Sequence, residues 1–139
     1  MDGVKFGSYD SYNNWNLFLK ENPKISSPEL KTYMVEIPGR NGQLDLTDSV
    51  FGGVKYKDRE IKLAFLSYAV QEQWASIVES MMESLHGKKM RIILPDDPSY
   101  YYYGRMVVEP DYGRHVLTIK VTATVEPYKT SINEGVKKL

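Results

Sequence analysis

The sequence contains no cysteine in its 139 residues, which removes several kinds of chemistry at once. Disulfides, thiolate zinc sites and cysteine nucleophiles are all excluded. No apolar run approaches the about 20 residues that a membrane-spanning helix needs. The N-terminal residues lack the basic start and apolar core of a signal peptide. We therefore expect a soluble protein that folds in a cytoplasm and that leaves the cell, if it does, without a cleaved leader.

An excess of either charge is also missing. The 18 Lys and Arg residues balance the 18 Asp and Glu residues, so the formal net charge is zero. This balance argues against a strong sequence-independent attraction to nucleic acid or to an anionic membrane. We expect neither a membrane nor a specific nucleic-acid sequence among the partners. The length and the hydrophobic fraction of 42% are sufficient for one domain with a single core.

Catalytic motifs are absent as well. The sequence has no P-loop, GxGxxG, GxSxG, HExxH or EF-hand spacing. A small hydrolase would have to bring together His86, His115, Asp96 and Asp97. Adjacent carboxylates diverge on an extended chain, and the spacing of the two histidines favours no catalytic dyad. We expect a protein that is not an enzyme, with no catalytic residue, no metal and no cofactor.

What the sequence does have is a segment of strands and turns over residues 31–62. Residues 33–37 alternate between apolar and polar, which predicts a strand with one buried face. Residues 38–42 then carry two turn signals, Pro-Gly and Asn-Gly, and Asn-Gly is typical of a tight hairpin. Leu44 and Leu46 resume the alternation. Because the segment contains no nucleophile and no metal ligand, it favours assembly over catalysis.

Apolar residues follow a helical spacing instead of alternating with polar ones in only one segment, at about residues 68–86. One apolar stripe at helical spacing predicts a helix there; its members are Val70, Trp74, Ile77, Val78, Met81, Met82 and Leu85. Ser67 is the expected N-cap, and Gly87 is the expected residue just after the C-terminus. A single helix cannot bury its stripe alone, so we expect it to pack over an open face or end of the sheet.

The remainder of the chain is predicted to be β. Residues 100–108 favour a strand, residues 110–113 a turn, and residues 117–125 alternate more clearly than any other segment. Residues 128–139 show no regular pattern and are expected to be an extended or mobile end. The predicted fold class is α+β and mainly β: an antiparallel β-barrel-like or sandwich domain with one packed helix.

The run from Tyr100 to Tyr103 is the most unusual local feature. On a strand, Tyr100 and Tyr102 face one way and their neighbours face the other. Exposed tyrosines are common in protein interfaces, and they also stack on sugar rings. The same run would equally suit a strand packed between sheet and helix. The residues alone leave open an interface, a packed strand and, as the alternative function, a carbohydrate-binding module that uses exposed tyrosines.

Several segments together resemble the N-terminal domain of phage distal tail proteins (Dit), components of siphovirus-type tails. The similar segments are VKFGSYDSYNNWNLFL, IPGRNGQLDLTDSVFGG with YKDREIKLAF, QEQWASIVESMMESLHG, KKMRIILPDDPSYYYYGRM and TIKVTATVEPYK. They cover residues 3 to 129 in the same order, and PGRNGQLDLT is the most specific of them.

This resemblance implies a structural role. In the family, six copies close into a ring at the tip of the tail. The ring joins the tail tube protein and the tape-measure protein to the tail-associated fibre or lysin protein, and it leaves a channel for DNA. The chain would then belong to the virion tail tip, and to the cytoplasm of the host bacterium before assembly. The family contributes no catalytic residue to this sequence.

A closed ring requires one patch of each copy to meet a different patch of the next. We expect these contacts from the 40–51 excursion and the tyrosine run: Arg40, Asn41, Leu44, Leu46, Phe51, Tyr100 and Tyr102. Many members of the family continue into a second, galectin-like β domain. We therefore expect residues 1–129 to form the N-terminal domain, and residues 130–139 to be a C-terminal tail or the start of a linker to an absent second domain.

Overall fold

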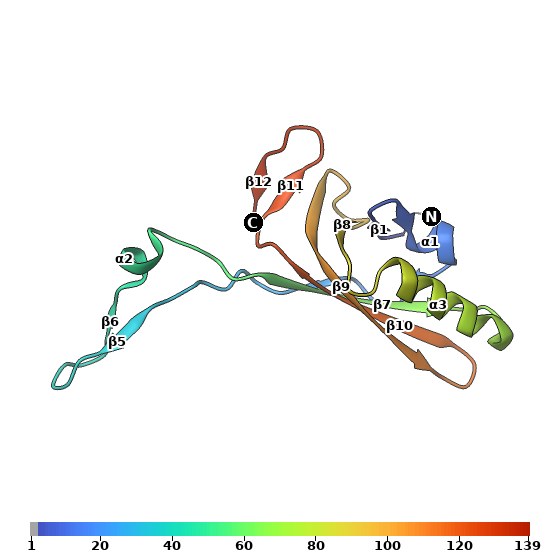
Figure 1. Ribbon diagram of the computed structural model, residues 1–139, viewed down its shortest axis with the longest axis horizontal. Coiled ribbons are helices and arrows are strands. Elements are labelled where there is room, and N and C mark those ends of the chain that lie inside the picture. The colour runs from blue at the N-terminus through green and yellow to red at the C-terminus, as the bar shows by residue number, and fades with distance from the viewer. Residues whose placement is uncertain (1–2) are drawn as a thin grey trace.

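The computed structural model describes residues 3–139, and Figure 1 shows a β-rich body from which a long two-stranded arm extends. The strands are β1 (Lys5–Phe6), β2 (Tyr9–Asp10), β3 (Phe18–Leu19), β4 (Lys24–Ile25), β5 (Met34–Glu36), β6 (Gln43–Asp45), β7 (Arg59–Ser67), β8 (Lys89–Ile93), β9 (Tyr100–Tyr112), β10 (Leu117–Val125), β11 (Lys129–Ser131) and β12 (Lys137–Lys138). The helices are α1 (Ser11–Trp15), α2 (Thr47–Phe51) and α3 (Trp74–Ser84), with a 3-10 turn η1 (Gln71–Gln73).

The main sheet is antiparallel and open. Within residues 3–139 its strands follow the order β2-β1-β8-β9-β10-β7-β3, with β4 added on β7 and β11 on β9. The prediction of a mainly β, antiparallel fold with a packed helix is confirmed. The barrel-like closure is not, because the two-residue strands at the ends of this order, β2 and β3, are joined by α1 and do not pair. A barrel closes only when its first and last strands pair.

The three long strands β7, β10 and β9 build the core. Leu117 to Val125 pairs with Ser67 to Arg59 on one side and with Tyr112 to Gly104 on the other. Alternate residues of all three strands are turned inward, where they meet the apolar stripe of α3. The strand predicted at residues 117–125 is confirmed. Its apolar residues, which recur at every second position, are the buried ones.

The turn predicted at residues 110–113 is wrong, because β9 continues to Tyr112. Met106 donates its backbone N–H to the Lys88 carbonyl, and Val108 donates its own to Nδ1 of His86. Even-numbered residues of β9 therefore point their amides away from β10. Pro110 is also even-numbered, so its backbone nitrogen faces the side of β9 away from β10. No strand lies beside β9 at this point, so the N–H that proline lacks would have had no partner in the sheet.

The helix predicted at residues 68–86 is confirmed in position but is shorter. Strand β7 continues through Ser67, so Ser67 is not the N-cap, and the helix proper begins at Trp74 after a 3-10 turn. Gly87 has the left-handed φ of 76° expected just beyond a helix. Two further five-residue helices, α1 and α2, were not predicted. The side chain of Asp10 caps α1 by accepting two backbone N–H groups.

The C-terminal residues are more ordered than predicted. Strands β11 and β12 form a hairpin, and β11 pairs with β9 through Thr130 and Tyr101. Lys129 forms an ion pair with Asp97 at 2.5 Å, and the ammonium groups of Lys129 and Lys138 lie over the ring of Tyr100. Alternation could not reveal this hairpin because its strands have only three and two residues. The domain boundary at residue 129 stays a prediction.

Gly104 allows β9 and β10 to approach closely, and we predict that Gly104→Ala strongly destabilises the body. A Cβ atom there would lie 2.0 Å from the backbone oxygen of Thr124. Overpacking against a backbone atom in a core strand costs about 3 kcal/mol. Gly135→Ala is the control, since its Cβ would meet nothing and only its φ of 69° carries a cost, of about 1 kcal/mol. Chemical denaturation measures both; equal losses would contradict the close-approach argument.

Candidate assembly surface

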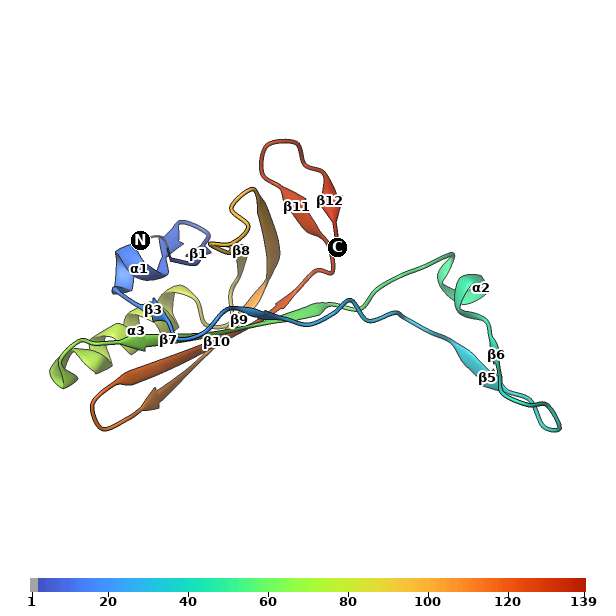
Figure 2. The same cartoon turned by 180° about the vertical axis from the view of Figure 1, so that it is seen from behind.

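The arm, which we define as residues 26–58, is the feature that sets this chain apart from an ordinary β domain. It leaves the body between β4 and β7 and carries β5, β6 and α2 at its far end, as Figure 2 shows from behind. Not one residue of the arm is buried. A segment of this length without a core gains little stability of its own, because two-stranded hairpins are marginal in water.

The base of the arm continues the pairing of β4 with β7. The backbone N–H of Lys31 donates to the Lys55 carbonyl at 2.9 Å, and that of Lys57 donates to the Glu29 carbonyl at 2.8 Å. The Lys57 ammonium also pairs with the Glu29 carboxylate at 2.9 Å. Both side chains are mostly exposed, so this ion pair adds little free energy. Backbone hydrogen bonds, rather than packing, hold the base of the arm together.

The tip of the arm, which we define as residues 33–52, is a hairpin closed by a helix. Met34 to Glu36 pairs with Asp45 to Gln43, which confirms the predicted strand, turn and strand. Thr47 joins β5 to α2: its hydroxyl accepts the Tyr33 N–H at 3.0 Å, and its backbone N–H donates to Asp45 Oδ1 at 2.9 Å. The tip therefore has a defined shape although it has no core.

The buried face predicted for residues 33–37 is wrong. Tyr33, Met34 and Ile37 are exposed and Val35 is half-buried. Alternation predicted the strand correctly, but it assumes that one face of the strand meets the protein's own core. Here the strand lies beyond the core. Its apolar side chains are therefore surface residues, as are Leu30, Val50 and Val54 elsewhere on the arm.

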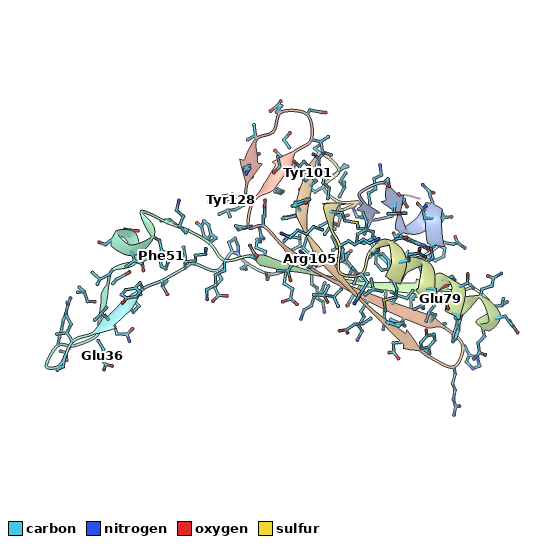
Figure 3. All side chains as sticks on the ribbon, viewed as in Figure 1. Glu36, Phe51, Glu79, Tyr101, Arg105 and Tyr128 are labelled. Carbon is cyan, nitrogen blue, oxygen red and sulfur yellow. The ribbon has the colours of Figure 1, made fainter. Side chains whose placement is uncertain are left out.

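Five of the seven predicted interface residues lie together on the tip. Arg40 and Asn41 are exposed in the hairpin turn, Leu44 and Leu46 are half-buried on and after β6, and Phe51 is half-buried at the end of α2. Figure 3 places Phe51 and Glu36 at this end of the molecule, away from the labelled residues of the body. Val50, exposed by 50%, lies within the predicted 40–51 excursion but was not singled out, and Val54, exposed by 57%, lies just beyond it.

The two predicted tyrosines lie elsewhere. Tyr102 is turned into the core with 6% exposure, so its ring has no free surface, and Tyr100 is half-buried beneath two lysines. On the other side of β9, the guanidinium of Arg91 covers the Tyr101 ring at 4.5 Å, and Tyr103 is exposed. The run therefore does not offer the row of open rings that a sugar-binding module would require.

The candidate acid–base residues are dispersed. Asp97 precedes β9 and is paired with Lys129, whereas His115 is exposed beyond the other end of that strand, about 40 Å away at the usual rise per residue. Nδ1 of His86 already accepts the Val108 N–H at 3.0 Å. No group of three potential metal ligands occurs in the part of the chain that the structure describes.

One hollow on the surface of the body is lined by side chains of both charges. This hollow, of about 300 Å³ on the outer face of the sheet, includes Lys24, Lys62 and Lys120 together with Glu21 and Glu109. These side chains come from neighbouring strands and do not surround an apolar pocket, which is the usual form of a small-molecule site. Among residues 3–139, no helix is long and apolar enough to cross a membrane.

Body and arm together define a class of fold: an open antiparallel sheet with one helix on its inner face and a long hairpin inserted between two of its strands. No family model matches the chain, and no curated protein sequence does. The fold is nevertheless found in a solved structure, so the fold resemblance expected from the sequence is confirmed.

That structure is the Dit protein (gp 19.1) of SPP1, described as a paradigm of the hub adsorption apparatus in phages that infect Gram-positive bacteria. The two chains superpose with a TM-score of 0.74 at 16% sequence identity. The match covers 94% of this chain and 52% of the SPP1 protein, so the present chain spans about half the length of that relative.

The hydrogen bonds between Thr47 and Asp45 in the tip can be tested directly. Thr47 lowers the pKa of Asp45, first through its hydroxyl and then through its backbone N–H. The folded tip thus favours the charged carboxylate, so this stabilisation is present above the ordinary carboxyl pKa and is lost as pH falls through the lowered value. Thr47→Val removes the hydroxyl and should raise the pKa of Asp45 toward its ordinary value.

Carboxyl-detected NMR titration measures this shift. Ser49→Ala, a change in the same short helix, is the control and should leave the pKa of Asp45 where it is in the wild type. An Asp45 carboxyl that titrates identically in the wild type and in the Thr47→Val variant would show that the hydroxyl does not make the contact.

Proposed function

We propose that this protein is a structural, ring-forming hub of a phage or prophage tail tip. The single observation that carries the proposal is the arm, an extended segment of 26–58 without one buried side chain, on a body that has the fold of a hub protein. An arm of this kind is stabilised only when another surface covers it. Further copies of the same chain supply such a surface in a closed assembly.

The form of the arm suits a cyclic assembly. In a ring, each copy uses one patch to contact a different patch on the next copy. The arm and the body are two different patches, and Figure 1 shows the arm directed away from its own sheet. Ring stoichiometry follows from the family resemblance, which favours six copies. The exposed apolar residues of the arm become the buried part of the contact, and Arg40 and Asn41 lie in its turn.

The partners of the ring are proposed from the same resemblance. The tail tube protein and the tape-measure protein would contact one side, and the tail-associated fibre or lysin protein the other. The protein would act at the virion tail tip after assembling in the host cytoplasm. A structural role is consistent with the contacts of the candidate acid–base residues. His86 accepts the backbone N–H of Val108, and Asp97 forms an ion pair with Lys129.

Self-association is the first test. We expect sedimentation velocity to show an assembly that grows with protein concentration and reaches one closed size. A particle that stays monomeric at all accessible concentrations would contradict the hub proposal, whichever residues form the contact.

The arm can be tested separately with the double variant Val50→Ser and Val54→Ser. Both valines are exposed in the single chain, so the melting temperature should change little. If they are buried between copies, losing their apolar area should weaken association about tenfold or more. Val136→Ser, at a valine of similar exposure outside the arm, is the matched control. Equal association of all three proteins would exclude this part of the arm from the interface.

A further inference from the structure

Four basic side chains lie close together on the face of the main sheet opposite to helix α3, on which Glu109 lies further along β9. Lys5 lies on β1, Lys89 and Arg91 on β8, and Arg105 on β9, and all four are exposed. The residues that alternate with them are turned toward the core, where α3 packs. We call these four residues the basic face.

The basic face is electrostatically unfavourable in a single chain. Lys89 is directly opposite Arg105 in the pairing of β8 with β9, and like charges in that position repel. Arg105 donates to the Gly87 carbonyl at 2.6 Å, and the guanidinium of Arg91 lies over the Tyr101 ring at 4.5 Å. Neither contact neutralises a charge. Within the described residues, none of the four forms an ion pair. An anionic partner would relieve this repulsion.

Apolar residues on the same face favour a protein as that partner. Tyr103 and Val107 flank Arg105 along β9 and are exposed by 39% and 41%. Apolar and aromatic side chains with charges around them are typical of protein interfaces. Contacts to a nucleic-acid backbone are made mainly by charged and polar donors, for which an exposed valine has no use.

The tip of the arm has the complementary composition. It carries three acidic residues, Glu36, Asp45 and Asp48, against one basic residue, Arg40. The tip also exposes the apolar side chains Met34 and Ile37. The tip and the basic face thus match in charge, and each has apolar side chains to bury.

The tip cannot reach the basic face of its own chain. Each half of the arm has about 16 residues, which span roughly 50 Å when extended. Figures 1 and 2 both show the arm directed away from β8 and β9, and Figure 3 shows Glu36 at the far end of the arm, whereas Tyr101 and Arg105 lie in the body. The occupant of the basic face must therefore come from another molecule.

We propose that the acidic tip of one copy docks on the basic face of the next copy, with Glu36, Asp45 and Asp48 facing Lys5, Lys89, Arg91 and Arg105. This inference rests on the proposed ring-forming function and assigns the surface that receives the arm. It makes the contact between copies an electrostatic one, so raising the salt concentration weakens association.

Charge reversal and mixing test the docking. Lys89→Glu alone and Glu36→Lys alone should each weaken self-association about tenfold, because residues 36 and 89 then carry the same charge at every contact between copies. When the two variants are mixed, copies can alternate, and each tip again meets a face of opposite charge. Association should return to the wild-type level in the mixture. Lys20→Glu, at an exposed lysine outside the basic face, is the control.

The outcomes separate this inference from the hub proposal. Each variant is first shown to keep the melting temperature of the wild type. Restoration by mixing then supports the docking, and its absence overturns it. Wild-type association that persists in Lys89→Glu overturns the docking and leaves the hub proposal standing. A wild-type protein that never associates overturns both. A duplex DNA fragment whose binding, measured by fluorescence anisotropy, is lost in Lys89→Glu while self-association persists would assign the basic face to nucleic acid instead.

Discussion

The structure depends on one constraint: backbone pairing extends further than the core does. Strands β4 and β7 pair in the body through Ile25 and Ile61, and the two halves of the arm continue that pairing outward beyond the last buried residue. Hydrogen bonds between backbone groups give the arm its direction, but they contribute little net stability in water. The arm is consequently a defined shape that lacks the apolar burial which stabilises a domain.

The body has the properties that a support for such an arm requires. Strand β7 runs without interruption from the base of the arm into the centre of the sheet, where β10 pairs with its whole length. A force on the arm therefore acts on a strand that is paired along its whole length. At the base, Tyr56 of the arm meets Tyr128 of the body edge to face, with ring centroids 6.0 Å apart. The C-terminal hairpin that follows Tyr128 pairs with β9 through Thr130 and Ser131, and Lys129 forms an ion pair with Asp97 just before β9.

The body and the arm also differ in the charges they carry. The chain as a whole is neutral, yet four basic residues lie close together on β1, β8 and β9, and acidic residues outnumber basic ones at the tip of the arm. The net charge of zero does not reveal this separation. Lys89 lies opposite Arg105 only because of the register in which β8 pairs with β9. Long-range attraction between unlike patches guides encounter and orientation more than it adds affinity. The apolar residues of the arm would then supply the remaining free energy of association.

The sequence by itself determined the β-rich class, the helix near residues 74–84, the hairpin at residues 34–45 and the strand at 117–125, because each depends on a local period or a turn dipeptide. It also pointed to the 40–51 excursion as a candidate surface. Only the tertiary structure decided that Tyr33 is exposed whereas Tyr102 is buried, that Pro110 lies inside a strand, and that the sheet stays open. The physical reason is that alternation states which residues share a face, whereas burial depends on what covers that face, and this is set by strand order and register far along the chain.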